Sequence, residues 1–124
     1  MLEIKFLKTK NGKEVNGPLI IIPNIFEDHR GFFYESWNLK NFREILKKDN
    51  INFVQDNHSR STMGVLRGLH YQLPPFEQGK LVRCTLGEIF DVALDLRKKS
   101  PTFGDSIVVK LSSNNKYQFW IPEG

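Results

Sequence analysis

The sequence predicts an all-β protein, a sandwich or barrel of short strands with one short helix. Three observations support this fold class. Short apolar stretches with the alternation of strands recur along the chain, turn residues separate them at regular intervals, and a single stretch has helical periodicity. Many short strands with one helix are typical of antiparallel β architectures. A chain of 124 residues with 40% hydrophobic residues suffices for one domain, residues 1–124, with one core.

The strands are expected wherever an apolar stretch lies between turn residues. Asn11-Gly12, Pro74-Pro75, Gly87 and Asn114-Asn115 are among the residues that mark the turns. In chain order, the expected strands cover residues 4–7, 19–22, 32–37, 52–55, 65–72, 80–86, 88–96, 106–111 and 117–121.

The helix is expected over residues 39–48. Asn38 can cap its first turn, and Lys47 and Lys48 gather at its end, where positive charge is favourable. The apolar side chains of this stretch fall on one face, which consists of Leu39, Phe42, Ile45 and Leu46.

The clearest hairpin joins residues 80–86 to residues 88–96 through Gly87. Alternation divides the second strand into two faces. We expect one face to lie in the core, and it consists of Phe90, Val92, Leu94 and Leu96. The other face is either the solvated outside or one wall of a polar cavity, and it consists of Ile89, Asp91, Ala93 and Asp95.

Composition and charge argue against several functional classes. The net charge is +4, but the basic residues are scattered and form no stripe with interleaved aromatics, so nucleic-acid binding is not expected. The longest apolar run, residues 19–22, is far too short to span a membrane. Glu3 and Lys5 stand where a signal peptide needs apolar residues. Cys84 is the single cysteine, which fits a buried packing thiol and a reducing cytoplasm.

A histidine and several cations are concentrated in two neighbouring expected strands. Arg67, Lys80 and Arg83 accompany His70 there, and such charges would repel one another in a core, so their concentration suggests a bound anion. Strict alternation would point Arg67 and His70 to opposite faces. Because glycine inside a strand often marks a break, we expect a bulge or local twist at Gly68 that lets both side chains share one cavity.

Gly64, five residues and then His70 begin a pattern similar to the first metal-binding motif of the cupin superfamily. The second histidine of that motif is replaced by Gln72. A carboxamide is a poor ligand for a transition metal, so no metal is expected at this position.

Seven sequence blocks, in a fixed order, resemble one enzyme family. They include Asp28-x-Arg30-Gly31-x-Phe33-x-Glu35 and the stretch Gly64–Gln72. The full set covers residues 28–35, 55–61, 64–72, 78–83, 87–97, 100–104 and 120–124. Through these blocks the chain resembles the dTDP-4-dehydrorhamnose 3,5-epimerase family. The members of this family are metal-independent cupin enzymes of nucleotide-sugar metabolism.

The resemblance implies a cupin-like antiparallel jelly roll or β-barrel that holds the sugar inside, without a cofactor. It also implies a homodimer that exchanges amino-terminal strands. The implied substrate is dTDP-4-keto-6-deoxy-glucose, on the route to dTDP-L-rhamnose. Carbons 3 and 5 of this sugar flank the ketone at carbon 4, so each can lose its proton as an enolate forms, and a neutral imidazole can act as the base.

The resemblance also implies roles for individual residues. His70 would be the general base, and Lys80 would stabilise the enolate oxygen. Arg67 would hold the substrate near its diphosphate or keto group. The remaining positions would contact the nucleotide, in part across the dimer: Arg30, Glu35, Gln55, Asp56 and Asn57.

The proton donor of the family is a tyrosine from a later strand. None of Tyr34, Tyr71 and Tyr117 stands at that motif position, so no acid is carried over, and the chain is expected to lack the carboxy-terminal part of the family's domain. Two alternatives therefore stay open. One is a non-catalytic nucleotide-sugar-binding cupin, and the other is a related single-site epimerase or ketoisomerase.

Overall fold

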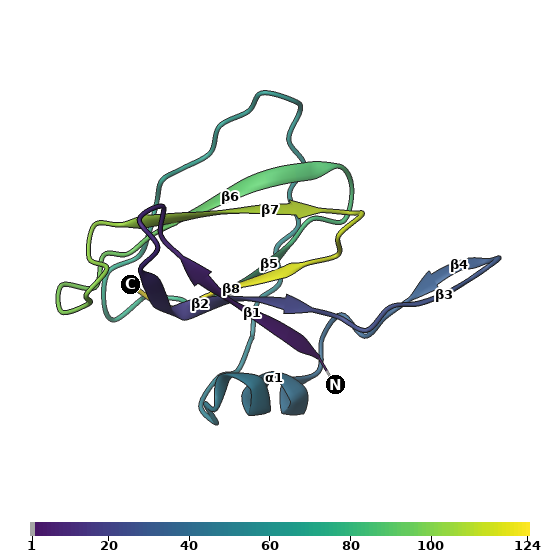
Figure 1. Ribbon diagram of the computed structural model, residues 1–124, viewed down its shortest axis with the longest axis horizontal. Helices are drawn as coiled ribbons and strands as arrows, with labels where there is room; N and C mark the ends of the chain where they lie inside the picture. The colour runs from purple at the N-terminus through teal and green to yellow at the C-terminus, as the bar shows by residue number, and fades with distance from the viewer. Residues whose placement is uncertain (1) are drawn as a thin grey trace.

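Eight strands and one helix are found in the structure, a computed structural model that describes residues 2–124 (Figure 1). Every pairing is antiparallel, in a four-stranded sheet of order β1-β2-β8-β5 and two-stranded sheets β3-β4 and β6-β7. Met1, which the expected domain includes, lies outside the described residues. The elements are β1 (Glu3–Lys8), β2 (Glu14–Ile22), β3 (Phe26–Asp28), β4 (Gly31–Phe33), α1 (Leu39–Leu46), β5 (Lys80–Arg83), β6 (Glu88–Leu94), β7 (Ser106–Ser112) and β8 (Gln118–Ile121).

The four-stranded sheet lies between the β6-β7 sheet and α1, and alternation along β2 explains how it serves both neighbours. Ile20 joins a core cluster with Phe119 of β8 and the buried residues of β7. Leu19 and Ile21 point the other way and pack with Phe42 of α1 and Trp120. We call the surfaces that the four-stranded and β6-β7 sheets turn toward each other the inner faces.

The expected helix is confirmed, with a slightly earlier end. The Asn38 side chain accepts a hydrogen bond from the backbone N–H of Asn41 at 3.2 Å, so asparagine caps the helix as predicted. At the other end Lys47 adopts the left-handed conformation, with a φ of 53°, which ends the helix after Leu46.

An all-β fold with one short helix is confirmed, but not every expected strand forms. Six expected strands coincide with β1, β2, β5, β6, β7 and β8, and β4 covers only the start of the expected strand 32–37. Residues 52–55 and 65–72 form no strand, so those two predictions were wrong. A strand needs a neighbour for its backbone N–H and C=O groups, and within residues 2–124 no backbone ladder joins either segment to another.

The predicted hairpin between residues 80–86 and 88–96 was also wrong. β5 pairs with β8, and β6 pairs with β7. The residues between β5 and β6 therefore cross from one sheet to the other. Cys84 lies in this crossing, where its half-buried thiol packs against the core cluster and donates to the Leu86 carbonyl oxygen at 3.2 Å.

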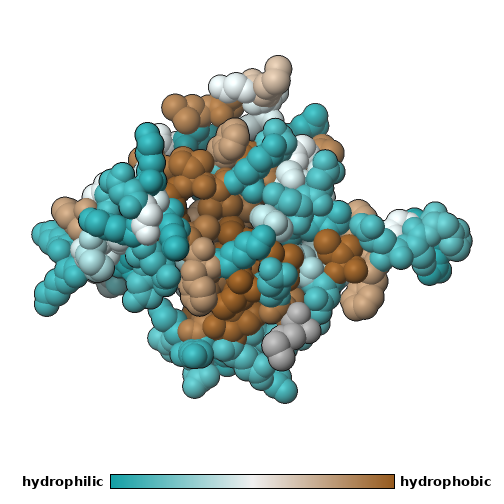
Figure 2. All heavy atoms as spheres, in the orientation of Figure 1, coloured by the Kyte–Doolittle hydropathy of each residue, from teal (hydrophilic) through white to brown (hydrophobic). Residues whose placement is uncertain are grey.

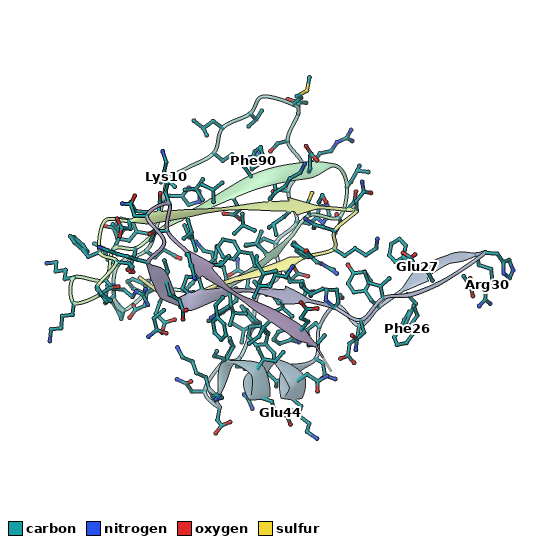
Figure 3. All side chains as sticks on the ribbon, in the orientation of Figure 1. Lys10, Phe26, Glu27, Arg30, Glu44 and Phe90 are labelled. Carbon is teal, nitrogen blue, oxygen red and sulfur yellow. The ribbon has the colours of Figure 1, made fainter. Side chains whose placement is uncertain are left out.

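The face of β6 that was expected in the core points outward. Phe90 is 73% exposed and Val92 is 39% exposed. The Phe90 side chain is labelled in Figure 3. The pairing with β7 gives the reason, because Ile89, Asp91 and Ala93 lie opposite the buried Leu111, Val109 and Ile107. The face that contains Ile89, Asp91 and Ala93 was expected to be either the solvated outside or one wall of a cavity. The structure shows that this face points inward.

The β3-β4 hairpin projects from the body as an arm (Figure 1). Phe26, Phe32 and Phe33 are exposed on it, and Arg30 lies at its tip (Figure 3). In the space-filling view the arm stands apart from a body whose visible face has apolar side chains at its centre (Figure 2). Among residues 2–124, no helix combines the length and apolar character that crossing a membrane requires.

Candidate active site

Lys80 is the predicted site residue that the sheet positions most firmly. It is the first residue of β5 and pairs with Ile121 of β8. Ile121 and Val82, two residues on from Lys80, both pack against the core cluster. Because residues two apart in a strand share a face, the half-buried Lys80 side chain leaves the sheet on its inner face.

The backbone just before Lys80 rests against Trp120. A Cβ built on Gly79 would collide with Cη2 of the indole and would lie 3.0 Å from Cζ3. Gly79 is not among the glycines with a positive φ, so its backbone conformation does not require glycine. The close approach of the indole is the reason that this position needs a residue without a Cβ. Trp120 belongs to the cluster that packs between α1 and the four-stranded sheet, and its contact with Gly79 fixes where β5 begins. Sequence reasoning did not single out this contact, because its two partners are far apart in the chain.

Asp91 reaches the inner face from the opposite sheet. Burial raises the pKa of its carboxyl above the usual value, and the positive charge of Lys80 and the backbone N–H of Val92 oppose that rise. An ammonium group on one inner face therefore interacts electrostatically with a carboxylate on the other. Sequence reasoning left the orientation of Asp91 open, and the buried residues of β7 decided it.

His70 lies in the long segment between α1 and β5 and is exposed. No strand forms around Gly68, so there is no β-bulge there, and its φ of 102° favours glycine. A Cβ on Gly68 would lie 3.4 Å from Nδ1 of His70, so the glycine lets the imidazole lie close to the chain. In residues 2–124 no hydrogen bond or ion pair joins His70 to Arg67 or Lys80.

The expected cluster of cations is divided in the structure. Arg67 is exposed and donates to the Ser61 hydroxyl at 2.9 Å and to the Arg60 carbonyl oxygen at 3.4 Å. Arg83 leaves β5 on the face opposite Lys80 and donates to the Tyr34 hydroxyl at 3.5 Å. The expectation that Arg83 joins one anion site with Lys80 was therefore wrong, because alternation along β5 separates them.

Arg30 and Glu35 are held by local contacts. Asp28 accepts from the Arg30 guanidinium at 2.6 Å and from the Arg30 backbone N–H at 2.8 Å, an exposed pair that lowers the pKa of Asp28 and raises that of Arg30. The two oxygens of Glu35 accept hydrogen bonds from the side-chain amides of Asn38 and Asn41, at 3.1 and 3.0 Å. Glu35 thus lies against the start of α1.

The stretch Gln55-Asp56-Asn57 is exposed in the segment between α1 and β5. The Gln55 amide donates to Oδ1 of Asn57 at 3.2 Å, so these two side chains lie side by side. Their remaining donors and acceptors face solvent and are available to a ligand.

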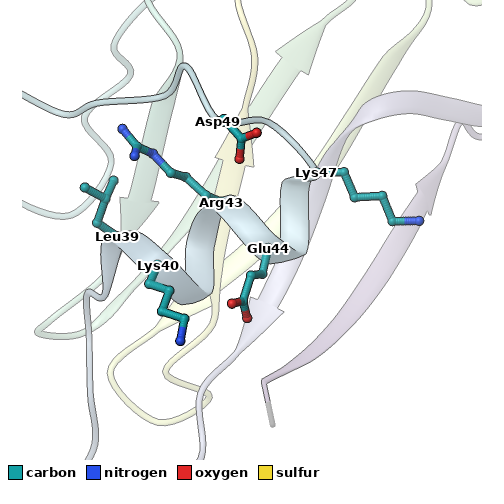
Figure 4. A pocket seen from close by; sticks show the side chains of 6 residues that line it. All are labelled: Leu39, Lys40, Arg43, Glu44, Lys47 and Asp49. Atoms are coloured by element: carbon teal, nitrogen blue, oxygen red, sulfur yellow. The ribbon is translucent and has the colours of Figure 1, made fainter.

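A hollow in the surface is lined by none of these residues. It has a volume of about 560 Å³ and runs along α1, lined by Leu39, Lys40, Arg43, Glu44, Lys47 and Asp49 (Figure 4). The hollow is open, and Arg43 is already engaged by the Ile51 carbonyl oxygen at 3.0 Å. Within residues 2–124, no group of three or more His, Cys, Asp or Glu side chains is placed to hold a metal ion. The inner faces are therefore the better candidate for chemistry.

Comparison with known proteins agrees with the sequence blocks. Residues 12–124 match the family model described as dTDP-4-dehydrorhamnose 3,5-epimerase. A relative of that name from Shigella flexneri is 61% identical over 111 residues, which is 90% of this chain and 61% of the relative. One from Methanothermobacter thermautotrophicus is 49% identical over 124 residues, which is 100% of this chain and 63% of the relative.

A solved structure gives the same result. The dTDP-6-deoxy-D-glucose-3,5-epimerase of Legionella pneumophila, in complex with dTDP-4-keto-L-rhamnose, superposes with a TM-score of 0.86 at 51% identity, over 98% of this chain and 62% of that one. The chain thus spans about three-fifths of the length of the relatives that it matches. From the fold, the sequence blocks and these matches, this chain belongs to the dTDP-4-dehydrorhamnose 3,5-epimerase family.

Proposed function

We propose that the protein acts on a dTDP-linked 4-keto-6-deoxy sugar as a 3,5-epimerase. The observation that supports this best is Lys80, an ammonium group on an inner face in a chain whose family match runs from residue 12 to residue 124. In this proposal His70 takes the proton from carbon 3 or carbon 5, and the electron pair moves to the oxygen at carbon 4. Lys80 stabilises the resulting enolate oxygen.

The polar residues outside the inner faces would bind the rest of the substrate. Arg67 would hold the diphosphate or the keto group, since its guanidinium is exposed and only partly engaged. The nucleotide would be contacted by Arg30, Glu35, Gln55, Asp56 and Asn57. Reprotonation of the opposite face of the ring would complete each inversion, and we assign no residue to that step. The reaction needs no cofactor, because the proton and the electron pair both return to the sugar.

Hydrogen exchange into the sugar tests this proposal. With dTDP-4-keto-6-deoxy-glucose in deuterated water, we expect NMR to show deuterium entering at carbons 3 and 5. Replacing His70 by alanine should slow the exchange by a factor of about 10² or more, because that is the least a positioned base contributes. Binding of dTDP, measured by calorimetry, should stay nearly intact. His58→Ala, which removes another exposed histidine of the same segment, is the matched control and should exchange at the normal rate.

The alternative candidate is a protein that binds the nucleotide sugar without turning it over. The exposed position of His70, with no hydrogen bond or ion pair to Lys80, favours it. In that case calorimetry would detect dTDP binding while no proton exchanged. Persistent exchange in His70→Ala would instead show that another group is the base, and exchange at a single carbon would indicate a single-site epimerase or a ketoisomerase.

We also propose that the protein forms a homodimer through its arm. A two-stranded hairpin alone is marginally stable in water, and Phe26, Phe32 and Phe33 expose large apolar areas on it. Packing this arm on a second copy would cover these side chains and carry Arg30 toward the partner. Sedimentation equilibrium should give twice the chain mass, and Phe33→Ser should shift the equilibrium toward the monomer. A monomer at all accessible concentrations would contradict the proposal.

The proposed compartment is the cytoplasm. Cys84 is the single cysteine of the chain and is half-buried in a packing position, which a reducing environment suits.

A further inference from the structure

The stretch that joins the arm to the body, between β4 and α1, is held by two side chains of the four-stranded sheet. The Tyr34 hydroxyl accepts a hydrogen bond from Arg83 of β5 at 3.5 Å. The Ser36 carbonyl oxygen accepts one from the side-chain amide of the buried Gln118 of β8 at 2.7 Å. Arg83 and Gln118 lie directly opposite each other in the register of β5 and β8, so their side chains leave the sheet on the same face. This cross-strand pair therefore faces the base of the arm.

A third contact holds the arm itself. The Lys116 ammonium lies over the ring of Phe32 in β4, with Nζ 4.2 Å from the ring centroid. The Phe32 ring in turn stacks on the ring of Tyr34, at a centroid distance of 6.0 Å. A cation placed over an aromatic ring at this distance is attracted by the electrons of the ring face. Lys116 lies in the turn between β7 and β8, at the end of the body from which the arm projects (Figure 1).

The turn that carries Lys116 is fixed by hydrogen bonds. Lys116 has a left-handed backbone, with a φ of 55°, a conformation that costs free energy for a residue with a Cβ and persists only where its surroundings hold it. The side-chain oxygen of Asn115 accepts from the backbone N–H groups of Ser112 and Tyr117, each at 3.0 Å. Its amide donates to the Lys110 carbonyl oxygen at 2.9 Å, and the backbone N–H of Lys116 donates to that of Ser112 at 3.0 Å. The ammonium group therefore reaches the arm from a fixed point of the body.

The groups that the body holds alternate with the motif residues of the arm. Because neighbouring residues of a strand point to opposite faces, Phe33 points away from the face on which Phe32 and Tyr34 stack. Glu35 lies in the chain between Tyr34 and Ser36, and the sheet holds both of these neighbours. The contacts with the body thus fix the backbone on either side of Glu35 and leave its carboxylate to other partners.

We propose that Arg83, Lys116 and Gln118 form a latch that fixes the direction in which the arm leaves the body. The latched segment carries two residues to which the proposed function assigns nucleotide contacts, Arg30 and Glu35, so the latch sets where they lie before a nucleotide arrives. Fixing a binding group in advance improves affinity, because less conformational freedom is lost on binding. This use of the latch rests on the proposed function, whereas the latch itself does not.

NMR tests the latch in the protein alone. Because the Lys116 ammonium lies over the Phe32 ring, the ring current should move the signal of the Lys116 Cε protons upfield of the other lysine signals. Lys116→Met, which loses one signal, assigns it, and Phe32→Leu should return it to the range of the other lysines. Backbone order parameters at residues 32 and 34 should lie near the rigid value of about 0.85 and fall in Lys116→Met. A Lys116 signal that Phe32→Leu leaves in place, or unchanged order parameters, would overturn the proposal.

Calorimetry with dTDP measures what the latch contributes to binding. Lys116→Met should weaken dTDP binding about two- to fivefold, the effect of one exposed cation–π contact. Lys116→Arg should restore the affinity, because a guanidinium also stacks on an aromatic ring. Lys110→Met is the matched control. It removes the same charge from β7, beside the same turn, but the partner of Lys110 is Glu88 at 2.8 Å, so dTDP should bind normally. Equal losses of affinity in Lys110→Met and Lys116→Met would overturn the role of the latch.

Exchange measurements separate this inference from the proposed function. If the protein exchanges the sugar protons, Lys116→Met should raise the apparent KM while the maximal rate stays nearly constant, because neither His70 nor Lys80 is altered. If the unaltered protein neither binds dTDP nor exchanges protons, but the Lys116 signal depends on Phe32, the proposed function fails while the latch stands. Thermal unfolding of each variant shows that the comparison is between folded proteins.

Discussion

Replacing Asp95 by asparagine is expected to lower the free energy of unfolding by about 3 kcal/mol, the lower end for breaking a buried ion pair, because Arg97 keeps some contact with water. The Asp95 side chain is 3% exposed. Its oxygens accept from the Arg97 guanidinium at 2.8 and 2.9 Å and from the hydroxyls of Ser100 and Thr102 at 2.5 and 2.7 Å. An asparagine amide would direct N–H donors at groups that are themselves donors.

The same network ties distant parts of the chain together. Arg97, which Asp95 holds in place, donates through its third nitrogen to the Asn16 carbonyl oxygen in β2 at 2.7 Å. The segment between β6 and β7 is thereby fastened to the four-stranded sheet. We expect the loss in Asp95→Asn to appear in urea unfolding as a lower midpoint, with little change in slope.

The stabilisation that Asp95 provides should decrease in acid. Burial alone would raise the pKa of Asp95, but the hydrogen bonds from Arg97, Ser100 and Thr102 hold it well below its usual range. A carboxyl with a lowered folded pKa stabilises the protein above its unfolded pKa of about 3.9, and this stabilisation is lost as the pH falls below that value. Unfolding at pH 7 and pH 3 should show this loss in the unaltered protein but not in Asp95→Asn.

Asp28→Asn is the matched control, since Asp28 and Arg30 repeat the same Asp-x-Arg spacing on the exposed arm. Exposed pairs contribute little, so its unfolding midpoint should not move. Equal losses in Asp28→Asn and Asp95→Asn would contradict the importance of burial.

The parts of the fold that local chemistry decides were predictable from the sequence. Asn38 marked the start of α1 because a capping side chain acts within three residues. The strands β2 and β7 were recognisable because their partners bury one or both faces. The faces of β6 were assigned the wrong way round, since both Phe90 and Ala93 suit a core by composition. Only the register with β7 decides between them, and register is a long-range property.

The candidate site was predictable to a smaller extent for the same reason. Lys80 was identified from its motif, but the division of Lys80 from Arg83 depended on strand pairing. Residues 65–72 were expected as a strand because their apolar content suits one, yet a strand forms only beside a neighbour, and the described residues supply none. The close approach of Gly79 to Trp120 joins residues 41 positions apart, which no local pattern reveals.

Replacing Trp120 by alanine is expected to lower the free energy of unfolding by about 3–5 kcal/mol, as for large aromatic residues in other cores. The indole is 3% exposed, and Phe42 and Phe53 pack edge-on against it at centroid distances of 5.4 and 6.1 Å. Trp37→Ala is the matched control. Trp37 belongs to the same aromatic cluster but is 42% exposed, so urea unfolding should show a clearly smaller loss. Equal losses of unfolding free energy in the two variants would contradict the view that the burial of Trp120 determines its contribution to stability.

Gly79→Ala tests the contact between this cluster and β5. The added methyl group would overlap the far edge of the indole, so we expect a loss of about 1–3 kcal/mol, typical of overpacking. A smaller ring should remove most of that loss, so Gly79→Ala should cost much less in a Trp120→Phe background than alone. Residues in contact are non-additive in this way, whereas additive losses would contradict direct packing.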